Sequence, residues 1–145
     1  ADRLGDTFRW KGENVSTTEV EQILDGFEQI VESVVYGVEI PGTNGRAGMA
    51  ELRLDRPHEE VDWPALSSYL KRELPPYAIP VFLRITDHGV ETTGTFKHQK
   101  NKLKEEKYDL NQHNDPVYVL LPGESCYQRL TPEMQADIDN GKHRF

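Results

Sequence analysis

The sequence of 145 residues has few of the features that mark secreted, membrane-spanning or zinc-binding proteins. Its single cysteine, Cys126, excludes an internal disulfide. Apolar runs all fall short of the roughly 18 residues that a membrane-spanning helix needs. The five histidines lack the i, i+4 spacing and the cysteine partners of a zinc site. We therefore expect a reducing, cytoplasmic setting and no metal site in this chain.

Positive charge is also scarce, because 17 lysines and arginines face 25 acidic residues and give a net charge of −8. A surface that binds nucleic acid needs an excess of basic residues to displace counterions, so we expect no nucleic-acid partner. One local stretch, residues 97–107, is nevertheless basic. It suits phosphate groups or anionic lipid headgroups, but we favour the alternative of a solvated helix face.

Residues 1–145 have the length of a single domain. Ser16 and Glu19 form a capping box that predicts a helix, and β-branched residues predict a strand at 30–40. After a turn at 41–45, a second strand at 47–54 completes a hairpin with a five-residue loop. The apolar face of the first helix comprises Val20, Ile23, Leu24 and Phe27.

A second helix is predicted from its cap at Asp62 to Leu74, since the following Pro75 and Pro76 forbid continuation. Further along we expect a strand at 81–85, a short exposed helix at 98–107 anchored by Leu103, a strand at 117–121 and a helix at 132–140 capped by Thr131. Strands and helices do not alternate regularly. This favours an α+β domain, with helices packed on a small mixed or antiparallel sheet.

Lysine 97 follows a turn of small residues in the segment Thr93-Gly94-Thr95-Phe96-Lys97-His98. A glycine-containing hinge lets an ammonium group reach a phosphate or a carboxylate as a compact point charge. The alternative is a solvated loop lysine, which is the more common fate of a lysine beside a glycine. A second segment at the start of the chain, DRLGDTFRWKGENVST at residues 2–17, decides between them.

Together these two segments resemble the C-terminal domain of adenylate-forming enzymes, which include acyl-CoA synthetases, luciferases and the adenylation domains of peptide synthetases. Many members have G-R-x-D-D-x-I-K and T-x-S-G-K at these places. The fatty acid transport protein branch, the very long-chain acyl-CoA synthetases, has G-D-T-F-R-W-K-G-E-N-V-S-T and T-G-T-F-K-H, as this chain does. The resemblance extends over nearly the whole sequence.

The resemblance implies a catalytic role for Lys97, which would bond the substrate carboxylate and an ATP phosphate during adenylation. Arg3 matches the arginine that contacts the ribose hydroxyls of the nucleotide, with a surface arginine as the alternative. Residues 1–6 correspond to the hinge about which this domain rotates. Gly5 stands where relatives have the hinge aspartate. Glycine tolerates large backbone changes and so is compatible with a hinge, and the resemblance implies that Asp6 would partly replace the missing carboxylate.

The segment Trp10-Lys11-Gly12-Glu13 corresponds to the loop that lines the pantetheine tunnel for CoA in relatives. An ordinary β-turn, with Gly12 at positive φ, is the alternative, and the two interpretations are compatible. The neighbouring Arg9 suits either a surface ion pair or a substrate contact. Residues 108–145 are expected to form a C-terminal extension of the domain.

The resemblance thus implies a fragment of a fatty acid–CoA ligase for long or very long-chain acids. ATP and Mg²⁺ would bind mainly to an N-terminal domain that this chain lacks, and CoA would be the co-substrate. We expect that N-terminal domain, the fatty acid, ATP and CoA as partners, and an isolated chain without activity. The location is expected to be cytoplasmic, with peripheral membrane contact of the full-length enzyme left open.

Two alternatives stay open at this point. The enzyme would act on another carboxylate, such as a bile acid or a carnitine-like acid, since acid selection belongs to the absent domain. In the second alternative the chain is a non-catalytic interaction domain with the same fold, which binds a partner through its acidic surface.

Overall fold

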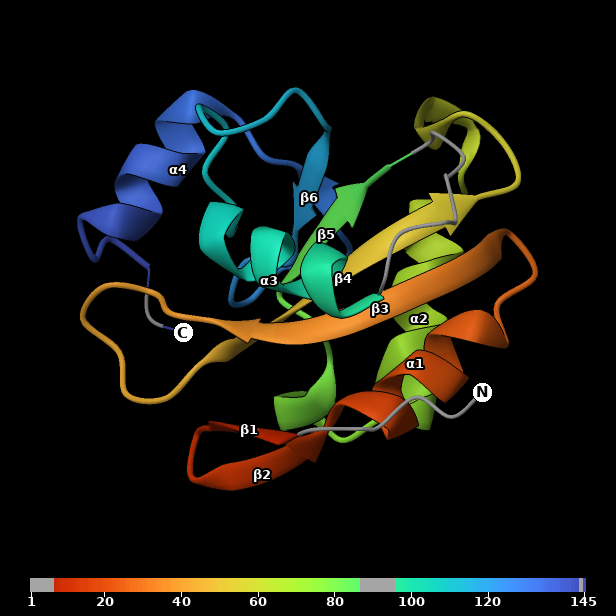
Figure 1. Cartoon of the computed structure of the whole chain (residues 1–145), viewed down its shortest axis with the longest axis horizontal. Helices are drawn as coiled ribbons and strands as arrows, with labels where there is room; N and C mark the ends of the chain where they lie inside the picture. The colour runs from red at the N-terminus through yellow and green to blue at the C-terminus, as the bar shows by residue number, and fades with distance from the viewer. Residues whose placement is uncertain (1–6, 87–95, 144) are drawn as a thin grey trace.

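The computed structural model describes residues 7–86, 96–143 and 145, and side chains within α3 from Asn101 onward. The elements in chain order are β1 (Thr7–Trp10), β2 (Glu13–Ser16), α1 (Thr17–Asp25), β3 (Ile30–Val38), β4 (Ala47–Leu54), η1 (His58–Glu60), α2 (Trp63–Glu73), η2 (Pro76–Ala78), β5 (Phe82–Ile85), α3 (Phe96–Glu106), β6 (Val117–Val119), β7 (Gln128–Arg129) and α4 (Pro132–Asp139). Strands β1 and β2 form a separate hairpin, and the other five form one sheet in the order β3-β4-β5-β6-β7 (Figure 1).

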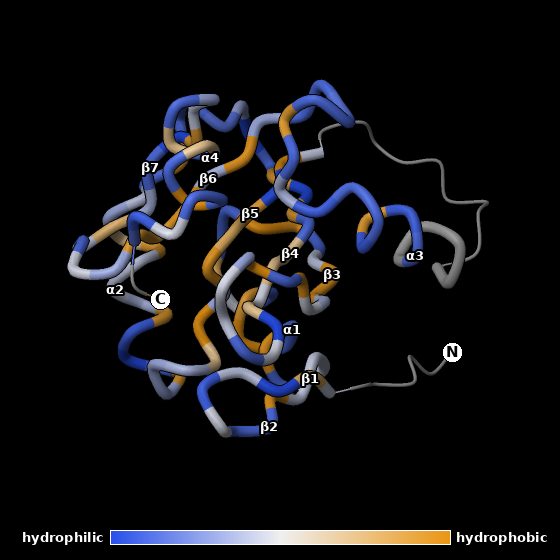
Figure 2. The backbone as a smooth tube through the Cα atoms, turned by 90° about the vertical axis from the view of Figure 1, so that its left-hand side faces the viewer, coloured by the Kyte–Doolittle hydropathy of each residue, from blue (hydrophilic) through white to orange (hydrophobic). Residues whose placement is uncertain are grey.

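The five-stranded sheet is mixed, because β4 and β5 pair in parallel while the other pairs of adjacent strands are antiparallel. Helix α2 connects β4 to β5, as a parallel pair requires a crossover. Helices α2 and α3 lie on opposite sides of the sheet (Figure 2). The α+β architecture, with helices packed on a small sheet, is thereby confirmed.

Alternation of side chains along the strands assigns each face of the sheet to its helices. Tyr118 faces α2 and stacks on Trp63 with ring centroids 4.0 Å apart. On the other face, Phe82 stacks on Tyr108, which follows α3, at 4.3 Å. None of the helices in the described parts of the chain is long and apolar enough to cross a membrane.

The three predicted helix N-caps are confirmed. The side chains of Ser16, Asp62 and Thr131 each accept a hydrogen bond from the amide three residues later, at 3.4, 3.0 and 3.2 Å respectively. Such bonds satisfy amides that have no partner within the helix. Helix α2 ends at Glu73, before the two prolines, as expected.

Two predicted boundaries were wrong, the first of them for a tertiary reason. Strands β3 and β4 are joined by residues 39–46 and not by five residues, because the end of this connection pairs with β1. There the amide of Arg46 donates to the carbonyl oxygen of Arg9 at 2.7 Å. Helix α3 begins at Phe96 and not at His98, so Lys97 belongs to its first turn.

Strand β3 is an edge strand of the sheet, and α1 covers part of that edge. Glu21 on α1 is buried and its Oε2 accepts a 2.8 Å hydrogen bond from the amide of Val35. A paired edge amide is not available to another chain, so this contact protects the sheet from edge-to-edge association. The spacing of apolar residues did not predict that Glu21 is buried, since a glutamate in a helix is normally exposed to solvent.

Candidate functional site

The segment at residues 10–13 forms the tip of the β1–β2 hairpin. Trp10 pairs with Glu13, and the two residues between them have positive φ, 55° at Lys11 and 82° at Gly12. Two successive left-handed residues are the hallmark of a type I′ turn, which matches the twist of the flanking strands. The β-turn interpretation of this segment is therefore correct, and its contact with CoA stays a prediction.

The hairpin is anchored by apolar side chains that point from it into the core. Phe8, Trp10 and Val15 are all buried, Trp10 to 3% exposure. Alternate positions of a strand share one face, so Phe8 and Trp10 both point to the core while Lys11 is left exposed at the tip. A four-residue strand gives a weak sequence signal, which is why the hairpin strands escaped prediction although this alternation was present.

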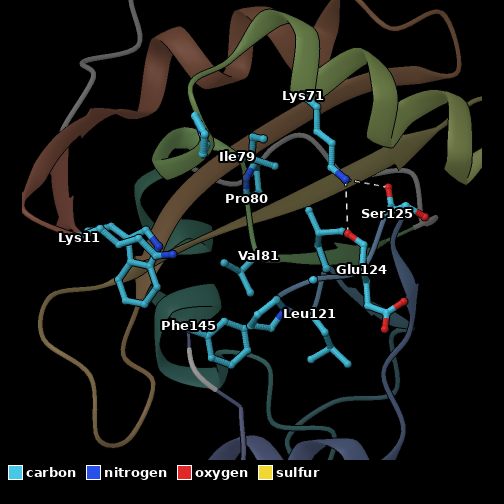
Figure 3. A pocket seen from close by; sticks show the side chains of 14 residues that line it. Lys11, Lys71, Ile79, Pro80, Val81, Leu121, Glu124, Ser125 and Phe145 are labelled. Carbon is cyan, nitrogen blue, oxygen red and sulfur yellow. Dashed lines mark hydrogen bonds between the residues drawn. The ribbon is translucent and has the colours of Figure 1, made fainter.

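A groove of about 660 Å³ lies beside the hairpin tip (Figure 3). We call it the hairpin groove; it is lined by Trp10, Lys11, Lys71, Pro76, Ile79, Pro80, Val81, Leu120, Leu121, Pro122, Gly123, Glu124, Ser125 and Phe145. Its walls are mainly apolar. They come from segments far apart in the sequence, which the parallel β4–β5 pairing and the β5–β6 pairing bring together.

Two lysines border these apolar walls. Lys71 Nζ donates to the carbonyl oxygens of Ser125 and Glu124 at 3.0 and 3.3 Å (Figure 3). Lys11 Nζ lies 5.9 Å from the centroid of the Trp10 ring, within the range of a cation–π contact. The hairpin groove therefore suits an elongated ligand with an apolar body and an anionic group.

The other predicted site residues do not line the hairpin groove in the described part of the chain. Arg3, Gly5 and Asp6 lie outside the described residues. Lys97 lies in the first turn of α3, and its side chain is also outside the description. Arg9, for which an ion pair or a substrate contact was considered, bonds the Asn14 side chain through Nη1 at 3.4 Å. Within the described residues, three or more histidine, cysteine or acidic side chains never gather closely enough to hold a metal ion.

Comparison with known protein families identifies the family of this chain. Residues 19–97 match the model of the family described as AMP-binding enzyme C-terminal domain. The chain belongs to this family. Human long-chain fatty acid transport protein 3 is 48% identical to this chain over 144 residues, which are 99% of this chain and 21% of that protein. The medium/long-chain-fatty-acid–CoA ligase FadD6 of Mycobacterium tuberculosis is 44% identical over 141 residues, 97% of this chain and 23% of the ligase.

Solved structures share the fold of this AMP-binding C-terminal domain. Coronafacic acid ligase from Pectobacterium brasiliense superposes with a TM-score of 0.63 at 23% identity, over 79% of this chain and 21% of that enzyme. The domain thus spans about a fifth of the length of the relatives it matches.

A buried ion-pair cluster, missed by sequence reasoning, lies between the sheet and α3 of the AMP-binding C-terminal domain. Arg84 on β5 donates through Nη1 to Glu106 at 2.7 Å and through Nε to Asp115 at 2.9 Å. The neighbouring Glu51, opposite Arg84 in the β4–β5 register, has its pKa raised by burial and partly restored by a hydrogen bond from Thr86. The sequence around Arg84 does not predict these contacts, because Glu106 and Asp115 follow it by 22 and 31 residues.

Proposed function

We propose that this chain is the C-terminal domain of a fatty acid–CoA ligase, in which Lys97 acts in adenylation and the domain then rotates to support thioester formation. One observation carries the proposal: similarity at 44–48% identity extends over 97–99% of the chain to a fatty-acid–CoA ligase and to a fatty acid transport protein. The substrate proposed is therefore a long or very long-chain fatty acid.

In the first half-reaction, a carboxylate oxygen of the acid attacks the α-phosphorus of ATP, and pyrophosphate leaves. Negative charge develops on the phosphoryl oxygens, and a positioned cation stabilises it. Lys97 is the proposed cation. Its place in the first turn of α3 supports this role, because amides at a helix N-terminus also favour anionic groups.

In the second half-reaction, the thiol of CoA attacks the acyl carbonyl carbon and AMP leaves. We place the pantetheine arm against the hairpin tip, Lys11 and Gly12. Gly12 supports close approach, since it presents no side chain and a Cβ there would meet nothing within 4 Å. The apolar walls and lysines of the hairpin groove also match an arm that ends in phosphate groups.

ATP would be held mainly by the part of the ligase that this chain lacks, together with Arg3. Mg²⁺ is proposed to bind there together with the ATP. The isolated chain is accordingly proposed to be inactive.

The test uses the full-length ligase that carries this sequence, with Lys97→Ala and, as a matched control, Lys102→Ala on the exposed side of the same helix. Pyrophosphate release with a panel of fatty acids reports the first half-reaction, and thioester formation from a supplied acyl-adenylate reports the second. We expect Lys97→Ala to lose the first by about 100-fold or more and to keep the second. The control should retain both.

Survival of both half-reactions in Lys97→Ala would refute its role and favour the non-catalytic interaction domain. If the wild-type ligase turns over bile acids or carnitine-like acids but not fatty acids, the substrate assignment fails while the reaction class stands.

A further inference from the structure

Helix α3, which carries Lys97, is held to the sheet by charge at its C-terminal end. The Arg84 side chain is only 7% exposed and bonds both Glu106, the last residue of α3, and Asp115 in the loop before β6. We call these three residues the Arg84 clamp. An arginine fork can bond two carboxylates at once with fixed geometry, which a lysine ammonium cannot reproduce.

Apolar contacts contribute little to the described part of α3. Among its side chains from Asn101 onward, only Leu103 is buried, while Lys102 and Glu105 are exposed. Two residues beyond the helix, the buried Tyr108 stacks on Phe82. Within the described part of α3, the bond from Arg84 to Glu106 adds a polar fixed point three residues beyond Leu103.

Because Lys97 lies far along α3 from the Arg84 clamp, a small tilt of the helix at the clamp would displace Lys97. At about 1.5 Å per residue, Lys97 lies about 13 Å along the helix axis from Glu106. A tilt of about 10° at the clamp would displace the Lys97 end by about 2 Å, and misplacement of a reacting group by about 1 Å can cost about 100-fold in rate.

We propose that Arg84 is a positioning residue for adenylation: by bonding Glu106 it sets the tilt of α3 and thereby the place to which Lys97 is delivered. This inference rests on the proposed role of Lys97. It also accounts for a buried arginine opposite three carboxylates, Glu51, Glu106 and Asp115, on the face of the sheet that α3 covers.

The two partners of Arg84 provide a matched pair of variants. Glu106 and Asp115 have similar exposure, 14% and 18%, and similar distances to Arg84, but only Glu106 belongs to α3. Glu106→Gln and Asp115→Asn each remove one charge and preserve the side-chain shape. A purely structural ion pair predicts equal consequences for the two, whereas positioning of α3 predicts unequal ones.

In the full-length ligase, we expect Glu106→Gln to lower kcat for pyrophosphate release about 10-fold or more, with KM for ATP and fatty acid within about 2-fold. Thioester formation from supplied acyl-adenylate should be retained. Asp115→Asn should lower kcat for pyrophosphate release by less than about 3-fold at a comparable loss of thermal stability. Equal losses in the two variants, or parallel losses in both half-reactions, would overturn the proposal.

A double-mutant cycle separates this inference from the proposed function. If Glu106 acts through Lys97, then Glu106→Gln adds less than about 2-fold to the defect of Lys97→Ala. Additive defects would overturn the inference alone, and a fully active Lys97→Ala would overturn the proposed function. Arg84→Lys, which keeps the buried charge and loses the fork, covers the case in which Glu106→Gln does not fold. It should show the same selective loss of adenylation.

Discussion

The carbonyl oxygen of Arg9 accepts a 2.7 Å hydrogen bond from the amide of Arg46, and this contact seats the β1–β2 hairpin against the end of the β3–β4 connection. Gly45 makes the approach possible. Its φ is +83°, and a Cβ atom there would overlap the Arg9 carbonyl. The hairpin tip that we assign to CoA is thus held in place by a glycine far from it in the sequence.

Gly45→Ala should therefore destabilise the domain more than an equivalent change at Gly42. Both glycines have φ of +83°, but a Cβ on Gly42 would meet nothing within 4 Å. Gly42→Ala should cost about 1 kcal/mol from backbone strain alone. The overlap should raise the cost of Gly45→Ala to about 2–4 kcal/mol. Urea unfolding of the 145-residue chain measures both, and equal losses would show that the connection moves away from Arg9 without penalty.

Lys11→Asn should stabilise the hairpin and raise the KM of the full-length ligase for CoA. Lys11 has a φ of 55°, and asparagine tolerates the left-handed region better by about 1 kcal/mol. Loss of the cation–π contact with Trp10 offsets about 0.5 kcal/mol, so we expect a net gain of about 0.5 kcal/mol in the free energy of unfolding. In the full-length ligase, KM for CoA should rise about 5-fold, because the groove loses an ammonium group. An unchanged KM would remove Lys11 from the CoA site.

His113 should make folding sensitive to mild acid. Its Nδ1 accepts from the amide of Asp115 at 3.1 Å, so the proton lies on Nε2, which is buried without a hydrogen-bond partner in the described residues. Burial, followed by the nearby Arg84 charge, holds the pKa of His113 below its usual value of 6.5. Below pH 6.5 the His113 side chain takes up a proton more readily in the unfolded chain than in the folded one. The free energy of unfolding therefore decreases as the pH is lowered.

The slope from this one group should reach at most about 1.4 kcal/mol per pH unit, between pH 6.5 and the lower pKa of the folded state, and vanish above about pH 7.5. Chemical unfolding at pH 7.5, 6.5 and 5.5 measures it. His113→Gln, which cannot take up the proton, should show a shallower decline over this range. Parallel curves for wild type and variant would contradict the prediction.

Local patterns sufficed to predict most elements of the fold. Ser16, Asp62 and Thr131 were identified as caps because a cap is a contact between residues three apart, which the sequence displays directly. The predicted strands at 30–40, 47–54 and 81–85 correspond to β3, β4 and β5 for the same local reason. Wherever a boundary depended on a distant partner, as at the connection 39–46, the prediction failed.

The sequence by itself determined the family, the α+β class and the two segments to which function is assigned, because these depend on residue identity and on short-range spacing. Tertiary structure alone decided that Glu21 is buried against Val35, and that Arg84 bonds carboxylates from two later segments. It also decided that residues from β1, α2 and the segment after β6 line one groove. The physical reason is that a charged side chain enters the interior only where folding brings it an exact partner, and that partner can lie anywhere in the chain.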